Sequence, residues 1–166
     1  MCLILIAWQA HPDYPLVVAA NRDEFFARPT AAAAFWPDAP QVLAGRDLEA
    51  GGTWLGASRQ RRFAAVTNYR EGGRQRVDAR SRGALVADFL TSRASPVAYL
   101  TQLETSAAEY NGFNLVVGNG ESLAYYSNSG DGQHRWLKPG IYGLSNHLLD
   151  TQWPKLASDK AAFAAA

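Results

Sequence analysis

The chain has a single cysteine, Cys2, which stands directly before the apolar run 3–7. One cysteine permits neither a disulfide within the chain nor a cysteine-based structural zinc site, so the fold cannot depend on such links. The 166 residues and the hydrophobic content of 48% suit one globular domain. The apolar run is far too short to span a bilayer, and the start of the chain lacks the pattern of a signal peptide. We therefore expect a cytoplasmic protein without a transmembrane segment.

Apolar runs separated by turn-forming residues predict three β-hairpins. Their strands are expected at 3–8 and 16–20, at 53–57 and 63–67, and at 113–117 and 123–127. Two short strands are expected after them, at 134–137 and 142–144. Repeated hairpins are typical of antiparallel sheets.

Helical periodicity appears at 83–90 and 97–108, and Trp153-Pro154 begins a third helix. The stretch 29–40 carries three prolines and little periodicity, so we expect it to be irregular. Because helices need a sheet face to cover, we expect an α+β fold with two mainly antiparallel sheets sandwiched between helical layers. The third helix receives no stop signal. We therefore expect that the C-terminal part of the domain is missing, and that the uncovered apolar surface favours a homodimer.

The position of Cys2 has a chemical interpretation and a structural one. An initiator methionine is normally removed before a small residue, which would leave a thiol and a free α-amine on Cys2. An α-amine titrates near pH 8, about where a general base works well, and here it would be bonded to its own nucleophile. The alternative is that Cys2 is a small buried hydrophobic residue, as free cysteines often are.

Asparagine and charged side chains stand near the ends of several expected strands. The polar tetrad 21–24, Asn-Arg-Asp-Glu, directly follows the second strand. Asn68 ends another strand, where a side-chain amide can serve as an oxyanion donor. Asn111, Asn114 and Asn146 repeat this theme. In the structural alternative, the tetrad caps a short helix over 24–26 and Asn68 satisfies a turn.

Together these motifs resemble the NRDE family, also called the transport-and-Golgi-organisation family, which is named after the tetrad at 21–24. The other matching motifs occur in the right order over essentially the whole chain, and they are Met1-Cys2, Gly51 to Gly56, Thr67-Asn68, Tyr142 to Asn146, Asp150-Thr151 and Trp153-Pro154-Lys155. The resemblance implies an αββα sandwich of the N-terminal-nucleophile hydrolase type. It also implies similarity to cysteine acylases that cleave linear amide bonds, such as bile-salt hydrolases and penicillin V acylases.

The resemblance implies roles for four residues. Cys2 would attack an amide carbonyl of a small acylated molecule while its α-amine shuttles the proton. Arg22 would stabilise the thiolate, Asp23 would hold the α-amine, and Asn68 would stabilise the oxyanion. Arg22 and Asp23 are adjacent here, whereas the acylases separate them slightly. Family members also continue well beyond residue 166.

Three asparagines are alternatives for a further catalytic amide, and we take Asn146 as the candidate. Asn21, Trp54, Asn111 and Asn114 are taken as substrate-binding candidates. No metal or cofactor is expected, because the three histidines are unclustered and the sequence lacks a haem attachment motif. A non-catalytic carrier of a lipid-like or haem-like ligand is the alternative function, with Trp36, Trp54, Tyr110 and Trp136 as aromatic residues that could line an apolar cavity.

The net charge of +1 argues against a nucleic-acid partner. The charge is nevertheless uneven, because eight arginines lie between residues 59 and 82, namely Arg59, Arg61, Arg62, Arg70, Arg74, Arg76, Arg80 and Arg82. A solvated loop is the favoured interpretation of this basic segment. A site for an anionic ligand is the second.

Overall fold

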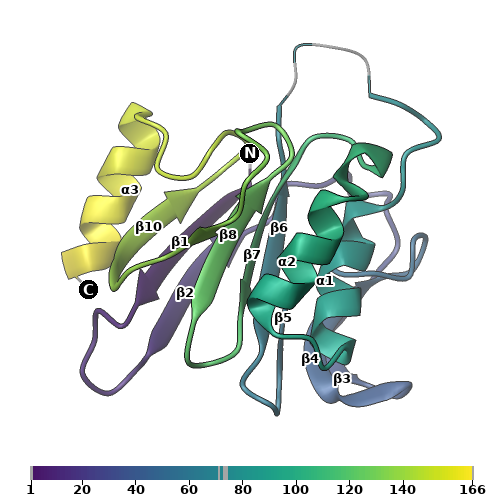
Figure 1. The fold of residues 1–166 in the computed structure, drawn as a ribbon, viewed down its shortest axis with the longest axis horizontal. Helices are drawn as coiled ribbons and strands as arrows, with labels where there is room; N and C mark the ends of the chain where they lie inside the picture. The colour runs from purple at the N-terminus through teal and green to yellow at the C-terminus, as the bar shows by residue number, and fades with distance from the viewer. Residues whose placement is uncertain (1, 71, 73–74, 166) are drawn as a thin grey trace.

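The structure is a computed structural model that describes residues 2–70, 72 and 75–165. The fold is α+β, with two antiparallel sheets and three α-helices (Figure 1). One sheet has three strands in the order β10-β1-β2, and the other has seven in the order β3-β4-β5-β6-β7-β8-β9. Within the described residues, no helix is long and apolar enough to cross a membrane.

The strands and helices have the following bounds. The strands are β1 (Leu3–Trp8), β2 (Leu16–Asn21), β3 (Thr30–Trp36), β4 (Ala39–Asp47), β5 (Leu55–Ser58), β6 (Phe63–Asn68), β7 (Phe113–Gly118), β8 (Leu123–Ser127), β9 (Arg135–Trp136) and β10 (Gly140–Leu144). The helices are α1 (Arg82–Thr91), α2 (Pro96–Glu104) and α3 (Pro154–Ala165), with a 3-10 turn at Ala107–Glu109.

β1 is the central strand of the three-stranded sheet. It is buried over nearly its whole length, which explains its uninterrupted apolar sequence. Leu3 pairs with Asn21 of β2, and Ile4 pairs with Leu144 of β10. This register brings the start of β1, the end of β2 and the end of β10 to one edge of the sheet.

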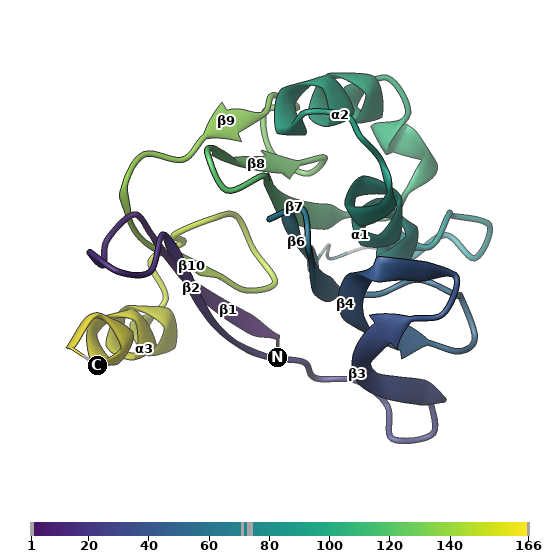
Figure 2. The same cartoon turned by 90° about the horizontal axis from the view of Figure 1, so that it is seen from below.

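One hydrophobic core lies between the two sheets. Ile4, Ile6 and Trp8 share one face of β1, as alternate residues of a strand do, and belong to a buried cluster with Phe63 and Val116 of the larger sheet. Helix α3 packs on β10 and β1 (Figure 2).

A second core lies between the larger sheet and helices α1 and α2. Leu85, Phe89 and Leu90 form the apolar face of α1 and pack in one cluster with Val66 and Leu115 of the sheet. Figure 2 shows helices on the outer sides of both sheets. The hydrophobic periodicity at 83–90 thus predicted the buried face of α1 correctly.

The three predicted hairpins are confirmed, but the prediction that residues 29–40 form an irregular stretch is wrong. Residues 30–36 and 39–47 form β3 and β4, which pair with each other. β3 is exposed along almost its whole length and is rich in alanine, so it carries no apolar alternation. The proposed helix over 24–26 is also absent. The helix predicted at 97–108 ends at Glu104.

Candidate functional site

A cavity of about 550 Å³ opens at the edge where β1 begins. Cys2, Arg22 and Asp23 line it from the smaller sheet, and Trp54 and Asn68 from the larger sheet. We call it the Cys2 cavity. The structure therefore brings the predicted nucleophile, the last three residues of the tetrad and two of the predicted asparagines, Asn68 and Asn111, to a single opening.

Cys2 is held by the two strands that flank β1. The Ser145 hydroxyl, just beyond β10, donates a hydrogen bond of 2.7 Å to the carbonyl oxygen of Cys2. Beyond β2, the Asp23 backbone N–H donates to Cys2 Sγ at 3.4 Å, and the thiol contacts the Asp23 carbonyl oxygen at 3.8 Å. The thiol is half-buried and lies at the cavity wall. Met1 lies outside the described residues.

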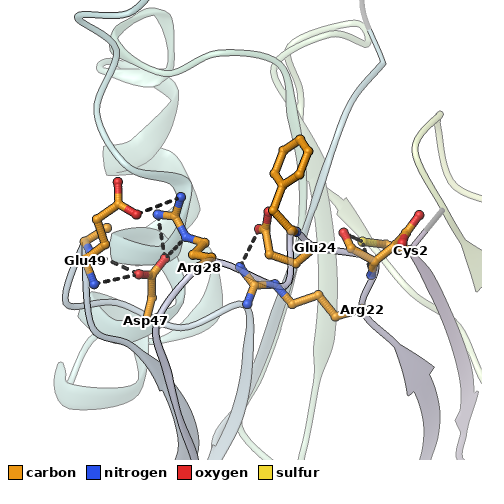
Figure 3. A network of polar contacts seen from close by, with 9 residues as sticks. Cys2, Arg22, Glu24, Arg28, Asp47 and Glu49 are labelled. Atoms are coloured by element: carbon orange, nitrogen blue, oxygen red, sulfur yellow. Dashed lines mark hydrogen bonds and ion pairs between the residues drawn. The ribbon is translucent and has the colours of Figure 1, made fainter.

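The two charged residues at the centre of the tetrad have different partners. A hydrogen bond with the amino terminus, and then the positive charge of that group, lower the pKa of the Asp23 carboxyl below its usual value. Arg22 forms an ion pair with Glu24, with 2.7 Å between Nη2 and Oε2 (Figure 3). The neighbouring residues Arg22 and Asp23 therefore contact different groups.

Asn68 and Asn146 lie close together, but their side chains have different surroundings. Asn146 Nδ2 donates to the Asn68 carbonyl oxygen at 3.0 Å, which links the segment after β10 to the end of β6. Asn146 does not line the Cys2 cavity. The exposed side chain of Asn68 does line it and makes no hydrogen bond to another described residue. Asn68 is therefore the predicted amide that a bound molecule could contact.

Asn114 is fully buried and belongs to a group of polar side chains between the sheets. Its amide donates to Thr67 Oγ1 at 3.2 Å and to the His147 carbonyl oxygen at 3.0 Å, and it accepts from the Tyr125 hydroxyl at 2.7 Å. Thr67 in turn donates to the Ser145 carbonyl oxygen at 2.6 Å. We call Thr67, Asn114, Tyr125 and Ser145 the polar seam.

The remaining substrate-binding candidates have different positions. Trp54 lines the Cys2 cavity and packs against both cores. Asn111 also lines the cavity, but its amide exchanges two hydrogen bonds of 2.9 Å with the backbone of Arg76. Asn21 is exposed at the end of β2 and is not part of the cavity wall. Of the aromatic residues considered for a ligand cavity, Trp36 and Tyr110 are core residues and Trp136 is exposed.

The sequence reasoning missed most of the charged side chains that line the cavity. Arg28 Nε donates to Asp47 Oδ2 at 2.8 Å, and Arg28 Nη1 lies 3.5 Å from Glu49 Oε2. We call Arg22, Glu24, Arg28, Asp47 and Glu49 the charged wall (Figure 3). Arg28 stands just before the stretch 29–40 that was expected to be irregular, and Asp47 stands after it, so no local pattern could pair them.

The pKa of the Asp47 carboxyl reflects opposing effects. Burial raises it, but hydrogen bonds from the backbone N–H of Ala50 and from Arg28 and Glu49 outweigh burial and lower the pKa overall. Asp47 is therefore held in its charged form. Among the described residues, no group of three or more histidine, cysteine, aspartate or glutamate side chains could hold a metal ion.

The basic segment 59–82 is not one patch. Arg62 is buried and donates to the Phe89 carbonyl oxygen at 2.9 Å, whereas Arg59 lies over the ring of Phe35. Arg80 and Arg82 reach the Cys2 cavity. Arg74 lies outside the described residues. The interpretation as a solvated loop thus holds for only part of the segment.

Comparison with known proteins gives a match to one family over the whole chain. The TANGO2 family, Transport and Golgi organisation 2, matches residues 1–166. The Transport and Golgi organization 2 homolog of Mus musculus is 43% identical over 175 residues, which cover 98% of this chain and 63% of that protein. The Homo sapiens homolog is 41% identical with the same coverage, and the Drosophila melanogaster protein is 33% identical over 183 residues. The chain thus spans less than two thirds of the length of these relatives.

Proposed function

This chain belongs to the Transport and Golgi organisation 2 family, and on that premise we propose that it is an N-terminal-cysteine hydrolase. The proposed reaction cleaves a linear amide bond of a small acylated molecule. We also propose that its two sheets and outer helices form the αββα sandwich of N-terminal-nucleophile hydrolases.

The contact between Cys2 and Asp23 carries this proposal. The thiol lies at the wall of a cavity large enough for a small molecule, and a backbone N–H contacts its sulfur at 3.4 Å. Asp23, whose backbone N–H makes this contact, has a side-chain carboxyl with a lowered pKa, so this side chain is a carboxylate. After removal of Met1, that carboxylate would hold the α-amine of Cys2 next to the thiol.

The proposed chemistry proceeds in two steps. Cys2 Sγ attacks the amide carbonyl carbon, and the thiol proton passes through the α-amine to the leaving nitrogen, so that an amine departs and a thioester remains. Water, deprotonated by the same α-amine, then attacks the thioester and releases a carboxylic acid and the thiol. The Asn68 amide would donate to the carbonyl oxygen as it becomes negative in each step. Asn146, which donates a hydrogen bond to the Asn68 backbone carbonyl oxygen, would position the Asn68 side-chain amide.

Charged residues around the cavity favour a polar substrate over an apolar ligand. Arg22, Arg28, Arg46, Arg80 and Arg82 all line it, together with four acidic side chains. Burying a hydrocarbon chain or a haem against these groups would remove them from water without replacing their hydration. A carrier of a lipid-like or haem-like ligand is therefore the less favoured function of the same cavity.

Intact-mass measurement tests the proposal. We expect the purified protein to lack Met1 and to gain one acyl group from a thiol-reactive acylating probe, with the added mass lost again on incubation as the thioester hydrolyses. Cys2→Ser, which keeps the side chain's size, should gain no such group at neutral pH because a hydroxyl is a far weaker nucleophile.

Asp23→Asn provides a second test, because it removes the carboxylate but keeps a side chain of the same shape. We expect slower acylation with Met1 still removed. Retention of Met1 on most molecules would contradict the proposal. A stable adduct that never hydrolyses, together with no release of amine from any of a broad panel of acyl amides, would favour the carrier instead.

A further inference from the structure

A second cavity, of about 260 Å³, lies at the opposite end of β1 from Cys2. Trp8 and Leu16 line it from the smaller sheet, and Phe63 and Leu123 from the larger one. It shares no lining residue with the Cys2 cavity. We call it the Trp8 cavity. The mainly apolar wall suits an aliphatic group, and the volume suits a ligand smaller than most drug-sized molecules.

Arg61 lies at this cavity in a conformation that arginine rarely adopts. Its φ is 60°, in the left-handed region that favours glycine. The turn is closed by hydrogen bonds from Ser58 N–H to the Arg62 carbonyl oxygen at 2.8 Å and from Arg61 N–H to the Ser58 carbonyl oxygen at 3.0 Å. Glycine would fit this turn with less strain. What arginine adds to the strained position is a guanidinium beside the cavity.

The neighbouring hairpin leaves space for the Arg61 side chain. Gly120, in the turn between β7 and β8, has a φ of 86°, and a Cβ there would lie 3.1 Å from Arg61 Nε. In the part of the chain that the structure describes, the Arg61 guanidinium has no hydrogen bond or ion pair. Its neighbour Arg62, in contrast, is bound to Phe89. The cavity thus has a cation that no group among the described residues neutralises.

The Trp8 indole provides a second polar group. Trp8 is only 3% exposed, yet its N–H donates to none of the described residues. Buried indole N–H groups usually have an acceptor. No fully buried side-chain polar atom of the described residues lacks a partner, so this N–H keeps some access to solvent. Trp8 lines the Trp8 cavity.

We propose that the Trp8 cavity is a binding site for a small aliphatic monocarboxylate, separate from the proposed hydrolase site. The carboxylate accepts hydrogen bonds from the Arg61 guanidinium and the Trp8 N–H, and the aliphatic tail packs against Leu16, Phe63 and Leu123. A carboxylate has acceptor oxygens for both donors, and its single negative charge matches one guanidinium. An uncharged ligand would leave the cation unpaired.

Titration with octanoate at neutral pH, followed by NMR of the indole N–H signals, tests this proposal. The Trp8 signal, assigned with Trp8→Phe, should shift on saturation, while the Trp54 signal at the Cys2 cavity stays in place. Octanamide, which has the same tail but no charge, should bind roughly tenfold more weakly, as expected for loss of one charge-assisted hydrogen bond.

Two variants of the turn between β5 and β6 distinguish an effect of the Arg61 charge on binding from an effect on protein stability. Arg61→Gly removes the guanidinium and relieves the backbone strain, so it should weaken octanoate binding roughly tenfold while the protein unfolds at an equal or higher temperature. Arg59→Gln changes a residue that contacts Phe35 instead and should leave binding unchanged. Unaltered binding to Arg61→Gly, a shift of Trp54 without Trp8, or no saturable shift would each overturn the proposal.

Discussion

The charged wall lines the Cys2 cavity, whereas the polar seam reaches it only through Thr67, and the two groups differ in their access to water. All four side chains of the seam are buried and hydrogen-bonded. In the charged wall, by contrast, side-chain exposure ranges from 13% for Asp47 to 63% for Glu49. Buried polar groups are costly to leave unpaired, whereas exposed ion pairs contribute little to stability. We therefore expect the seam to join the sheets and the wall to contact ligands.

The largest effect is expected for Asn114→Leu. This change removes the acceptor of the Tyr125 hydroxyl and the donor to the His147 carbonyl oxygen, so buried groups lose their partners. We expect the free energy of unfolding, measured by urea denaturation, to fall by about 3–5 kcal/mol. Asn68→Leu is the matched control on an exposed amide and should change it by less than about 0.5 kcal/mol. Equal losses would erase the distinction between the two regions.

An intermediate effect is expected for Asp47→Asn, the most buried position of the charged wall. The charge-assisted hydrogen bonds of Asp47 should contribute about 1–2 kcal/mol to stability at pH 7. Because folding lowers the pKa of Asp47, this contribution is fully present above the unfolded pKa, near 4, and is lost as pH falls through the folded value.

Urea denaturation at several pH values tests this prediction. The difference between wild type and Asp47→Asn should shrink between pH 5 and about pH 2. Glu49→Gln, at the exposed end of the same ion-pair network, should cost less than about 0.5 kcal/mol at any of these pH values. A difference that stays constant with pH would mean that the Asp47 charge does not contribute to stability.

The smallest effect on stability is expected for Arg22→Gln, and it sharpens the comparison because reactivity should change instead. Loss of an exposed ion pair should alter the free energy of unfolding by less than about 0.5 kcal/mol. Acylation of Cys2 at pH 7 should nevertheless slow several-fold, because the cavity that Cys2 lines loses a positive charge that would stabilise negative charge developing in the reaction. Arg59→Gln, outside the cavity, is the control. A large loss of stability with an unchanged rate would assign Arg22 a structural role.

The hairpins could be predicted because their core residues are local in sequence. β1 and β2, β5 and β6, and β7 and β8 each combine an apolar run with a clear turn signal. β3 and β4 could not be predicted in this way. β3 is exposed, and its pairing with β4 depends on backbone hydrogen bonds that its alanine-rich sequence does not reveal.

The candidate site was predictable only in part. Cys2 and Asp23 meet because they stand at the same end of one predicted hairpin. The sequence could not show which asparagine contacts a bound molecule. All of them stand near strand ends, and the face of the strand on which each lies decides its surroundings. Asn114 is buried between the two sheets, whereas Asn68 faces the cavity. Arg28 and Asp47 meet only because β3 and β4 exist.

The hydrogen bond between Ser145 and Cys2 joins residues 143 positions apart, and this separation bears on when the proposed reaction could first take place. During synthesis, β2 can pair with β1 early, but β10 cannot flank β1 until nearly the whole segment has left the ribosome. Contacts so distant in sequence form late, because the intervening chain must be ordered first. A nascent chain would therefore carry its thiol at the first residues and yet lack the strand that fixes it. The proposed reaction would then begin only after β10 has paired with β1.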